Sequence, residues 1–481
     1  MLLTHLLDNI HHSVLQGSTN IDITNIRFDS RLVCAGDVFV ATVGTSVDGH
    51  DFIENAVRSG AVAIVCQKRM ENMLSGITYI LVDNSNYALA LMANAYYGQP
   101  STKLTLVGVT GTNGKTTIAT LLYKLTMAMG FKTGLLSTVC NYINEDEIPA
   151  THTTPDALQL NALLKRMVDH GCQYAFMEVS SHAADQDRIA GLHFRGGIFT
   201  NLTRDHIDYH KTFDNYLHAK QKFFNMLPDT AFAVTNKDDR NGLIMTQNSK
   251  ARIVTYSTQS MADYRGQILE QGFDGMLLNL DHREVFVRLV GRFNLSNILA
   301  IYAAAAQLGF DKDDILRVLS SLTAVNGRFQ PIISPKGWTA IIDYAHTPDA
   351  VANVIDTINS IRKHSARLIT VVGCGGNRDK GKRPQMARKA YDGSSLLILT
   401  SDNPRLEKPE DIINDMLAGL NTEEQNNTMV ITNRHEAIKT ACLLAQTDDV
   451  ILIAGKGHEN YQIIGTEKHH FDDHEEVAKY L

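Results

Sequence analysis

The chain has 481 residues, a length that suggests roughly three domains of ordinary size. Its 44% hydrophobic and 20% charged residues are typical of a soluble globular protein, and its net charge of −7 argues against a general nucleic-acid or membrane-surface binder. The six cysteines stand far apart without a C-x-x-C pair, which argues against a structural zinc site and a disulfide framework and suits a reducing compartment.

The N-terminal segment MLLTHLLDNIHHS is apolar, but it has no positive n-region and carries Asp8 inside the run, so it is not predicted to be a signal peptide. No apolar stretch approaches the length needed to span a membrane. We therefore expect a cytoplasmic protein, without membrane insertion and without a nucleic-acid partner.

Short β-rich runs alternate with helical stretches along the chain, which favours α/β architecture with largely parallel sheets. Two breaks, GQPSTK at residues 98–103 and SPKG at residues 334–337, each precede a β-rich run. They divide the chain into three predicted domains, at residues 1–100, 101–333 and 334–481.

A glycine-rich loop, VGVTGTNGKTT at residues 107–117, lies near the start of the second domain. The P-loop pattern G-x-x-x-x-G-K-[ST] requires a glycine where this chain has Val109, so the loop is either an accidental match or a variant with its own spacing. Residues 104–110 are predicted as a buried strand and residues 115–130 as a helix, whose free N–H groups and positive dipole end suit phosphate. Lys115 adds a cation and Thr116 a hydroxyl suited to Mg²⁺, so we interpret the loop as a nucleoside triphosphate site.

Polar side chains follow several other predicted strands, at the strand ends where ligands gather in α/β sheets. Glu178 ends the run YAFME and is placed to hold Mg²⁺ beside the phosphates, although a solvated turn residue would also fit. In the third domain Gly373 begins a turn that resembles a dinucleotide site, but Arg378 stands where the third glycine belongs, so NAD binding is not supported. The basic loop around Arg378 either faces anionic groups or is solvated.

An alternative interpretation is a P-loop GTPase switch, because the sequence NKDD at residues 236–239 follows an apolar run, as the guanine-reading N-K-x-D motif does. The glycine spacing of the P-loop argues against this class, as does the lack of a D-x-x-G motif after an apolar strand before Asn236. The same four residues are also a common polar turn.

Several motifs occur in order along the chain: FDSRLVCAGDVFVA, GTNGKTT, HTTPD, MEVSSH, TNLTRDHIDYH, YLHAKQKFF, GRFNLSN, DYAHTPDA, GGNRDKGKRP, SDNPR and AGKGHENYQ. This series resembles that of the Mur ligases, whose P-loop has the spacing G-x-x-G-x-x-G-K-T. The resemblance implies an N-terminal α/β domain that binds a UDP-sugar, a central P-loop ATPase domain with a mostly parallel sheet, and a C-terminal Rossmann-like α/β domain that binds an amino acid. We expect a monomer.

The resemblance implies an ATP-dependent, ADP-forming amide ligase of peptidoglycan synthesis. A carboxylate of UDP-N-acetylmuramoyl-L-Ala-D-Glu would be phosphorylated, and an amine would attack the acyl phosphate, so proximity and pre-placed cations are the main catalytic tools. The implied ATP-binding residues are Gly111, Thr112, Asn113, Gly114, Lys115, Thr116, Asn297, Arg328 and Asp343. The implied residues for the muramoyl nucleotide are Ser30, Thr153, Thr154, Ser180, Gln186 and Arg188.

The implied catalytic residues are Lys115, Glu178, His206 and Lys220, and the implied Mg²⁺ ligands are Thr116, Glu178, His206 (for a second ion) and Lys220. A lysine ammonium cannot ligate Mg²⁺, which takes oxygen donors. The family resolves this with a carbamate on the matching lysine, so Lys220 is expected to carry one; a plain surface lysine is the alternative.

The choice of amino acid depends on the motif DNPR at residues 402–405. Meso-diaminopimelate differs from lysine by a carboxylate beside the distal amine, and the planar fork of Arg405 can bind that carboxylate bidentately. In the family this motif accompanies diaminopimelate-adding members, while lysine-adding members lack the arginine, so a lysine-adding enzyme is the alternative. The resemblance completes the pocket with Arg378, Asp402, Asn403, Pro404, Gly455 and Glu459, the last placed to take the distal ammonium.

Overall fold

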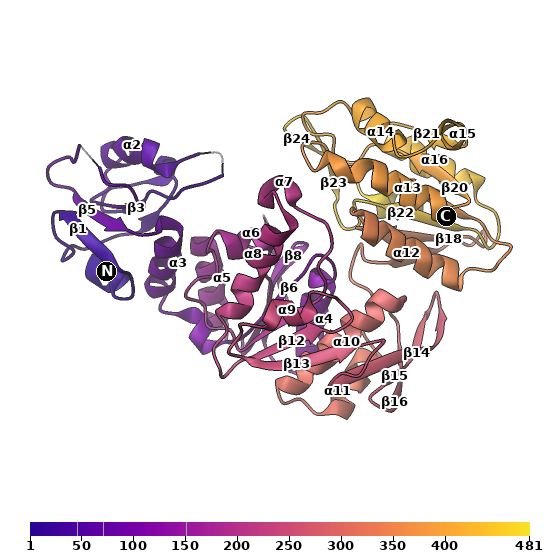
Figure 1. The fold of residues 1–481 in the computed structure, drawn as a ribbon, viewed down its shortest axis with the longest axis horizontal. Helices are drawn as coiled ribbons and strands as arrows, with labels where there is room; N and C mark the ends of the chain where they lie inside the picture. Colours follow the sequence, from indigo (N-terminus) through magenta and orange to yellow (C-terminus); the bar gives the residue numbers. More distant parts are fainter. Residues whose placement is uncertain (46, 71, 151) are drawn as a thin grey trace.

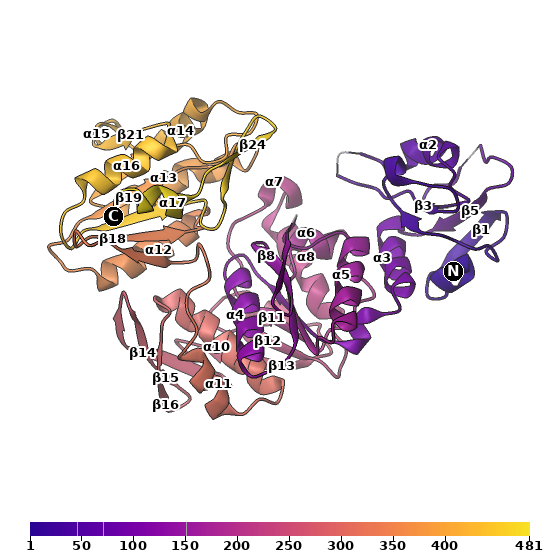
Figure 2. The same cartoon turned by 180° about the vertical axis from the view of Figure 1, so that it is seen from behind.

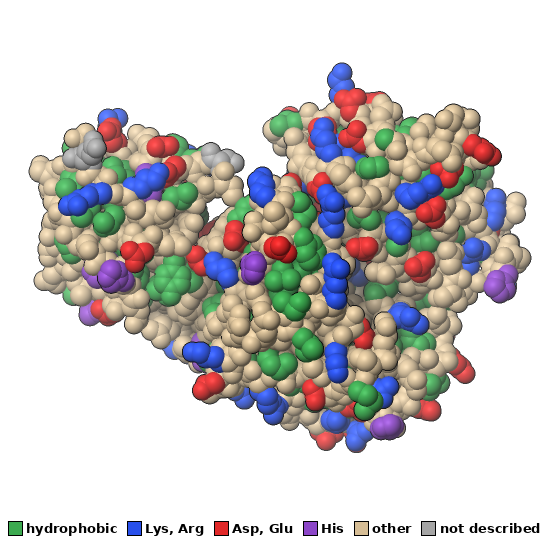
Figure 3. Space-filling model, in the orientation of Figure 1, with side chains coloured by type: hydrophobic (Ala, Val, Ile, Leu, Met, Phe, Trp, Pro, Cys, Tyr) green, Lys and Arg blue, Asp and Glu red, His purple; other side chains and the backbone are tan. Residues whose placement is uncertain are grey.

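The computed structural model describes residues 1–45, 47–70, 72–150 and 152–481, which form three α/β parts, each built on its own main sheet (Figures 1 and 2). The central part lies between the other two, and the N-terminal and C-terminal parts face each other across an open notch above it (Figure 3). The predicted α/β architecture of three domains with mostly parallel sheets is confirmed, while the boundaries at residues 100 and 333 stay a prediction.

The N-terminal part has a five-stranded sheet in the order β1-β5-β4-β3-β2, in which β1 is antiparallel to β5 and the other pairs are parallel. The strands are β1 (His12–Gln16), β2 (Ile26–Arg27), β3 (Val38–Val40), β4 (Ala63–Cys66) and β5 (Thr78–Val82), and the helices are α1 (Leu3–Leu7), α2 (Ile53–Arg58), α3 (Ser85–Tyr96) and the 3-10 turns η1 (Ser30–Leu32) and η2 (Gly49–Phe52). Helix α3 packs against α5 (Ala157–Asp169) and so joins this part to the central one.

The central sheet has the strand order β16-β15-β14-β13-β12-β11-β6-β10-β7-β8-β9. Its middle, from β13 to β7, is parallel, and antiparallel hairpins extend it at both edges. The strands are β6 (Thr105–Thr110), β7 (Thr133–Leu136), β8 (Cys140–Ile143), β9 (Asp146–Pro149), β10 (Tyr174–Glu178), β11 (Gly196–Phe199), β12 (Phe232–Asn236), β13 (Arg252–Ser257), β14 (Tyr264–Gly272), β15 (Gly275–Leu280) and β16 (Arg283–Val287).

Helices cover both faces of this sheet, because alternate side chains of a parallel strand point to opposite faces. Val107 and Val109 pack in one buried cluster with α4 (Lys115–Ala128) and α10 (Arg292–Gln307), whereas Leu106 packs in another with α5 and α8 (Phe213–Asn225). The remaining helical elements of this part are η3 (Pro100–Lys103), α6 (Ser181–Asp185), α7 (Ile207–His210), α9 (Gly242–Thr246) and α11 (Lys312–Leu319).

The C-terminal part has a six-stranded sheet in the order β17-β18-β22-β19-β20-β21, parallel except for the edge strand β17. The strands are β17 (Gln330–Ile333), β18 (Thr339–Asp343), β19 (Leu368–Val372), β20 (Leu396–Leu399), β21 (Thr428–Val430) and β22 (Val450–Ala454), and the hairpin β23 (Tyr461–Ile464) and β24 (Glu467–His470) forms a separate small sheet. The helices are α12 (Pro348–Ile361), α13 (Arg383–Gly393), α14 (Pro409–Leu417), α15 (Thr422–Asn426), α16 (Arg434–Leu444), α17 (Asp473–Ala478) and the turn η4 (Lys380–Lys382). Residues of α12, α13 and α14 cover one face and those of α16 and α17 the other, as in a doubly wound fold. Within the described residues, no helix combines the length and the apolar character needed to cross a bilayer.

Candidate active site

The glycine-rich loop joins β6 to α4 at the carboxyl edge of the central sheet, between β10 and β11. Gly111 has φ 145°, and a Cβ there would lie 1.9 Å from Thr200 Oγ1. Gly114 has φ 90°, and a Cβ there would lie 2.5 Å from Asn297 Oδ1. The unusual spacing of these glycines therefore follows from how closely the loop after β11 and helix α10 approach the loop.

Two lysine side chains converge on the carbonyl oxygen of Gly111. Lys115 Nζ donates to it at 2.9 Å and to the Thr112 carbonyl at 2.8 Å, and Lys220 Nζ donates to it at 2.8 Å from helix α8. Desolvation lowers the pKa of both ammonium groups, and the like charge of Lys115 lowers the pKa of Lys220 further. The lowered pKa favours a neutral Lys220, which leaves Lys115 as the cation of the pair that can attract phosphate.

Glu178 ends β10, and its carboxylate faces the first turn of α4. Oε1 accepts hydrogen bonds from Thr116 Oγ1 at 2.9 Å and from the backbone N–H of Thr138 at 2.7 Å. Oε2 is buried and has no hydrogen-bond partner among the described residues. An unpaired carboxylate oxygen beside a threonine hydroxyl fits a hard divalent cation, which takes such oxygen ligands.

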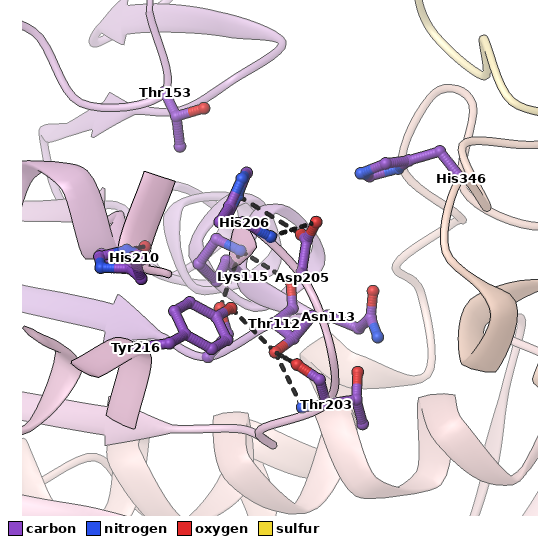
Figure 4. Close-up of polar contacts among 12 residues, drawn as sticks. Thr112, Asn113, Lys115, Thr153, Thr203, Asp205, His206, His210, Tyr216 and His346 are labelled. Atoms are coloured by element: carbon purple, nitrogen blue, oxygen red, sulfur yellow. Dashed lines mark hydrogen bonds and ion pairs between the residues drawn. The ribbon is translucent and has the colours of Figure 1, made fainter. Parts of the chain in front are cut away.

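Asp205 and His206 follow β11 and project toward the same loop (Figure 4). Asp205 accepts the backbone N–H of His206 at 2.9 Å, and its second oxygen lies 3.4 Å from His206 Nε2. Burial lowers the pKa of His206 to about 3, so the imidazole is neutral and able to ligate a metal. No cluster of three or more His, Cys, Asp or Glu suited to a metal ion occurs in the described part of the chain.

The central and C-terminal parts together enclose a cavity of about 200 Å³ beside the loop, lined by Asn113, Gly114, Asn297, Arg328, Asp343, Tyr344 and His346 among others. Arg328 Nη2 donates to Thr116 Oγ1 at 3.1 Å, and the guanidinium lies 4.5 Å from the centre of the Tyr344 ring. Asp343 accepts the backbone N–H groups of Phe329 and Ala345, both at 2.7 Å. Its carboxylate therefore orders the chain around Arg328.

His346 points toward the glycine-rich loop from the C-terminal side (Figure 4). Its Nδ1 lies 2.9 Å from the Tyr344 carbonyl, and burial lowers its pKa to about 4. Since a carbonyl oxygen can only accept, Nδ1 carries the proton and Nε2 is left as an acceptor.

Most residues of the predicted muramoyl-nucleotide set form one hydrogen-bonded group. Arg188 donates to the Thr154 carbonyl at 2.9 Å and to Gln186 Oε1 at 2.6 and 3.0 Å, and Thr154 Oγ1 accepts the backbone N–H of Ser180 at 3.1 Å. Thr153 joins from the side through Thr138, with 3.0 Å between the hydroxyls. Ser30 begins η1 in the N-terminal part, and within the described residues no hydrogen bond joins it to the other five.

The predicted diaminopimelate residues lie at the carboxyl edge of the C-terminal sheet, in the loops after β19, β20 and β22. Arg405 is half-buried and has φ 53°, and its Nη1 donates to the Gly376 carbonyl at 2.9 Å. Desolvation lowers the pKa of Arg405, and the nearby cation Arg378 lowers it further. Neither guanidinium pairs with a carboxylate among the described residues.

The other side of this pocket is acidic. Asn403 Nδ2 donates to Glu459 Oε2 at 2.8 Å, and a Cβ on Gly455 would lie 2.6 Å from Asp402 Oδ2. Burial and the neighbouring Asp402 raise the pKa of Glu459. Two guanidinium groups without a carboxylate partner among the described residues therefore lie near two carboxylates, an arrangement that matches a carboxylate and an ammonium on one ligand.

Sequence reasoning missed three contributors to this pocket. Gly375 and Gly376 make room for the motif, since a Cβ on the first would lie 2.9 Å from Arg405 Nη1 and one on the second 1.9 Å from the Pro404 carbonyl. Lys456 is fully buried beneath the acidic side. The glycines flanking Lys456 signalled a tight loop but gave no sign that the lysine points inward.

The NKDD segment forms a turn whose side chains hydrogen-bond to the backbone of neighbouring loops. Asn236 is buried and donates to the Thr200 carbonyl at 2.8 Å, and Asp239 accepts the backbone N–H of Leu202 at 2.8 Å. Asp238 accepts the backbone N–H of Thr258 at 2.7 Å. The polar-turn interpretation accounts for these contacts without a guanine.

Three stretches of the chain match Mur ligase families. Residues 22–97 match the Mur ligase family catalytic domain, residues 109–305 the Mur ligase middle domain and residues 327–457 the Mur ligase glutamate ligase domain.

Two curated relatives named UDP-N-acetylmuramoyl-L-alanyl-D-glutamate--2,6-diaminopimelate ligase match nearly the whole chain. The protein from Parabacteroides distasonis is 57% identical over 479 residues, covering 100% of this chain and 99% of its own length. The protein from Phocaeicola vulgatus is 56% identical over 475 residues, covering 99% and 98%. A solved structure described by the same ligase name is 33% identical, with a TM-score of 0.70, and the match covers 100% of this chain and 98% of that one.

Proposed function

This chain belongs to the Mur ligase family, and on that premise we propose that it joins meso-diaminopimelate to UDP-N-acetylmuramoyl-L-Ala-D-Glu with ATP, forming ADP and phosphate during peptidoglycan synthesis. We further propose that it acts as a monomer in the cytoplasm. One observation carries the choice of amino acid: Arg378 and Arg405, without carboxylate partners among the described residues, lie close enough to Asp402 and Glu459 for the four charges to act on the same Tyr461 hydroxyl.

The glycine-rich loop would bind the ATP phosphates. The helix α4 N-terminus supplies backbone N–H groups, and Lys115, now bonded to carbonyls of its own loop, would turn to the phosphates. Arg328 and Asn297 border the cavity beside the loop and would hold the rest of the nucleotide. Because these two residues come from the linker before β17 and from α10, the nucleotide would bridge two parts of the protein.

Thr116 and Glu178 fit a Mg²⁺ ion, since a buried carboxylate oxygen lacks a partner among the described residues. His206 would serve a second ion with its neutral imidazole. Bound Mg²⁺ would neutralise the phosphate charge that grows during transfer.

Lys220 suits carbamate formation because the reaction with CO₂ requires a neutral amine. Burial and the neighbouring Lys115 lower its pKa well below the ordinary lysine value, and so favour that neutral form. A carbamate on Lys220 would place an anionic oxygen ligand beside Lys115, where the Lys220 ammonium now donates to the Gly111 carbonyl.

The muramoyl nucleotide would lie between the N-terminal and central parts, with Ser30 at its uridine end and Arg188 beside its anionic groups. Arg188 is already oriented by Gln186 and by the Thr154 carbonyl, which reduces the entropy lost on binding. The γ-carboxylate would thereby be directed at the terminal phosphate of ATP, and closure around the cavity would keep water from the acyl phosphate.

The diamino acid would place its distal carboxylate on Arg405 and Arg378 and its distal ammonium on Glu459 and Asp402. This anchoring leaves the other amine to attack the acyl phosphate. L-lysine would offer no partner to Arg405 and would meet it with like charge, so selection would work partly by rejection.

A phosphate-release assay tests the proposal. Purified protein with ATP, Mg²⁺, UDP-N-acetylmuramoyl-L-Ala-D-Glu and meso-diaminopimelate should release phosphate only when every component is present, and mass spectrometry should detect the tripeptide product. Phosphate release from GTP alone would favour the GTPase alternative. A clear preference for L-lysine would keep the ligase and overturn the amino-acid assignment.

A further inference from the structure

Lys456 follows β22 in the sequence GKGHE, and its side chain is fully buried in the C-terminal part. Burying a lysine is costly unless its charge is paired and its three N–H donors are used. The groups around its ammonium therefore show which negative charges it offsets.

The ammonium of Lys456 lies among groups of the amino-acid pocket. Its Nζ donates to Asn403 Oδ1 at 3.1 Å and to the Tyr461 carbonyl at 2.5 Å. It lies 3.6 Å from Asp402 Oδ1 and 3.6 Å from Glu459 Oε2. One cation thus ties together the loops after β20 and β22 and the start of β23.

The hydrogen bonds of Lys456 also orient the side chain of Asn403. The Asn403 oxygen that accepts from Lys456 also accepts the backbone N–H of Ile463 at 2.9 Å. With its oxygen held, the Asn403 amide must direct its N–H₂ group to Glu459 Oε2, 2.8 Å away. The orientation of Glu459 therefore depends on Lys456 through Asn403 as well as directly.

Charge balance gives the lysine its function. Asp402 and Glu459 are like charges in a desolvated pocket, and together they would exceed one ammonium by one unit. Lys456 offsets one of these two charges, and the nearby cation Arg405 would be taken up by the distal carboxylate of the ligand, so a single ammonium matches the charge that remains. We propose that Lys456 is a positioning residue that holds Asp402, Asn403 and Glu459 as a receptor for a single ammonium group, the distal one of a diamino acid. The inference rests on the proposed function and adds a residue to it.

Glu459 is the titrating group through which this arrangement can be tested. The charged or titratable groups that interact electrostatically with it are Asp402, Arg405, Lys456, Tyr461, Tyr344 and Arg434. Burial and Asp402 raise the pKa of Glu459, while Lys456 and Arg405 lower it. Without Lys456, the effects of burial and Asp402 would be less opposed, so the pKa of Glu459 should rise and its carboxyl should ionise at higher pH.

The experiment compares Lys456→Met, which removes the charge and the hydrogen bonds, with Lys456→Gln, which keeps a donor. The assay measures phosphate release while meso-diaminopimelate, ATP and the muramoyl dipeptide are varied in turn. For Lys456→Met we expect kcat/KM for meso-diaminopimelate to fall by about 10- to 100-fold at neutral pH, the range for lost hydrogen bonds to charged groups. The fall should lie in KM for that substrate, with KM for the other two unchanged.

The pH profile separates positioning from a general structural defect. The ratio of variant to wild-type kcat/KM should rise with pH, because Glu459 regains its charge at higher pH in the variant. In a Glu459→Gln background this pH dependence should vanish. The matched control is Lys468→Met, which removes a lysine 4.3 Å from the Tyr461 ring on the exposed strand β24 and should leave every KM unchanged.

The outcomes distinguish the two levels of inference. Wild-type ligation of meso-diaminopimelate with unchanged KM in folded Lys456 variants would overturn the role of Lys456 and leave the proposed function standing. A pH-independent loss, or failure of Lys456→Gln as well as Lys456→Met to fold, would reduce Lys456 to a structural lysine. A wild-type enzyme that refused meso-diaminopimelate would overturn the proposed function, and this inference with it.

Discussion

Replacing Arg405 by alanine tests the amino-acid pocket most directly. The Arg405 guanidinium is half-buried, and its Nη1 donates one hydrogen bond to the Gly376 carbonyl. Its remaining N–H donors are available for a bidentate bond to a carboxylate. Losing a desolvated arginine–carboxylate pair costs about 2–5 kcal/mol. Arg378 remains nearby but is exposed and screened by solvent, so we expect about 3 kcal/mol, or roughly a 100-fold loss of kcat/KM for meso-diaminopimelate.

The assay follows phosphate release at saturating ATP and muramoyl dipeptide while the amino acid is varied. L-lysine has no distal carboxylate, so any slow activity with it should not fall in Arg405→Ala. The matched control is Arg388→Ala on helix α13, where the arginine pairs with Glu424 and Asp392 outside the pocket. Equal losses with both amino acids, or wild-type preference for L-lysine, would refute the reasoning.

Three further changes test other parts of the structure. Lys220→Ala should nearly abolish ligation, and added acetate should restore part of it by supplying an anionic oxygen ligand; full activity without acetate would exclude a carbamate. Gly375→Ala should raise KM for meso-diaminopimelate with little change in thermal stability, because the added methyl would lie 2.9 Å from Arg405 Nη1. Glu407→Gln should lower the free energy of unfolding at neutral pH by about 1–3 kcal/mol, since Arg383 is fully buried and loses a charged partner. The bond from Arg383 lowers the pKa of Glu407 from 4.5 to about 2. The stabilisation by the Glu407 carboxylate is therefore fully present above pH 4.5 and is lost as the pH falls toward 2. The difference in free energy of unfolding between wild type and Glu407→Gln should shrink over the same range.

The sequence allowed the strand ends to be predicted because parallel strands place their carboxyl ends at one edge. Glu178 after β10 and the loop before α4 meet there, as expected from the order of apolar runs and polar residues. The order of strands, glycines and polar residues was therefore enough to predict a nucleotide site at this edge. The prediction of an amino-acid site around Arg405 rested mainly on the family resemblance, because a strand-end turn with a solvated arginine accounts for Asn403 and Pro404 but not for the rest of the motif.

Other features depend on contacts that no local pattern encodes. Arg405 adopts φ 53°, a conformation that the sequence before it does not demand, and the bond from its N–H to the Ile463 carbonyl holds it there. Arg328 reaches Thr116, 212 positions away, only because the linker before β17 lies over the nucleotide loop. Lys456 is buried because the loop after β20, 53 positions away at Asn403, meets the short stretch from Lys456 to Tyr461. Such placements arise from tertiary packing and appear only in the folded chain.

The two substrate-facing regions divide differently among the three parts of the fold. Strand ends of a single sheet supply the amino-acid pocket, whereas the nucleotide cavity draws on the central part and on the linker and first strands of the C-terminal part. The identity of the added amino acid can therefore change by substitutions in one sheet while the phosphate-handling loop stays constant. Exchange of the whole C-terminal part between relatives is more demanding, because Arg328 must again reach Thr116 and Asp343 must again line one cavity with Asn297. If the proposed sites are right, a single sheet sets the choice of amino acid, whereas the coupling to ATP is shared between two parts of the fold.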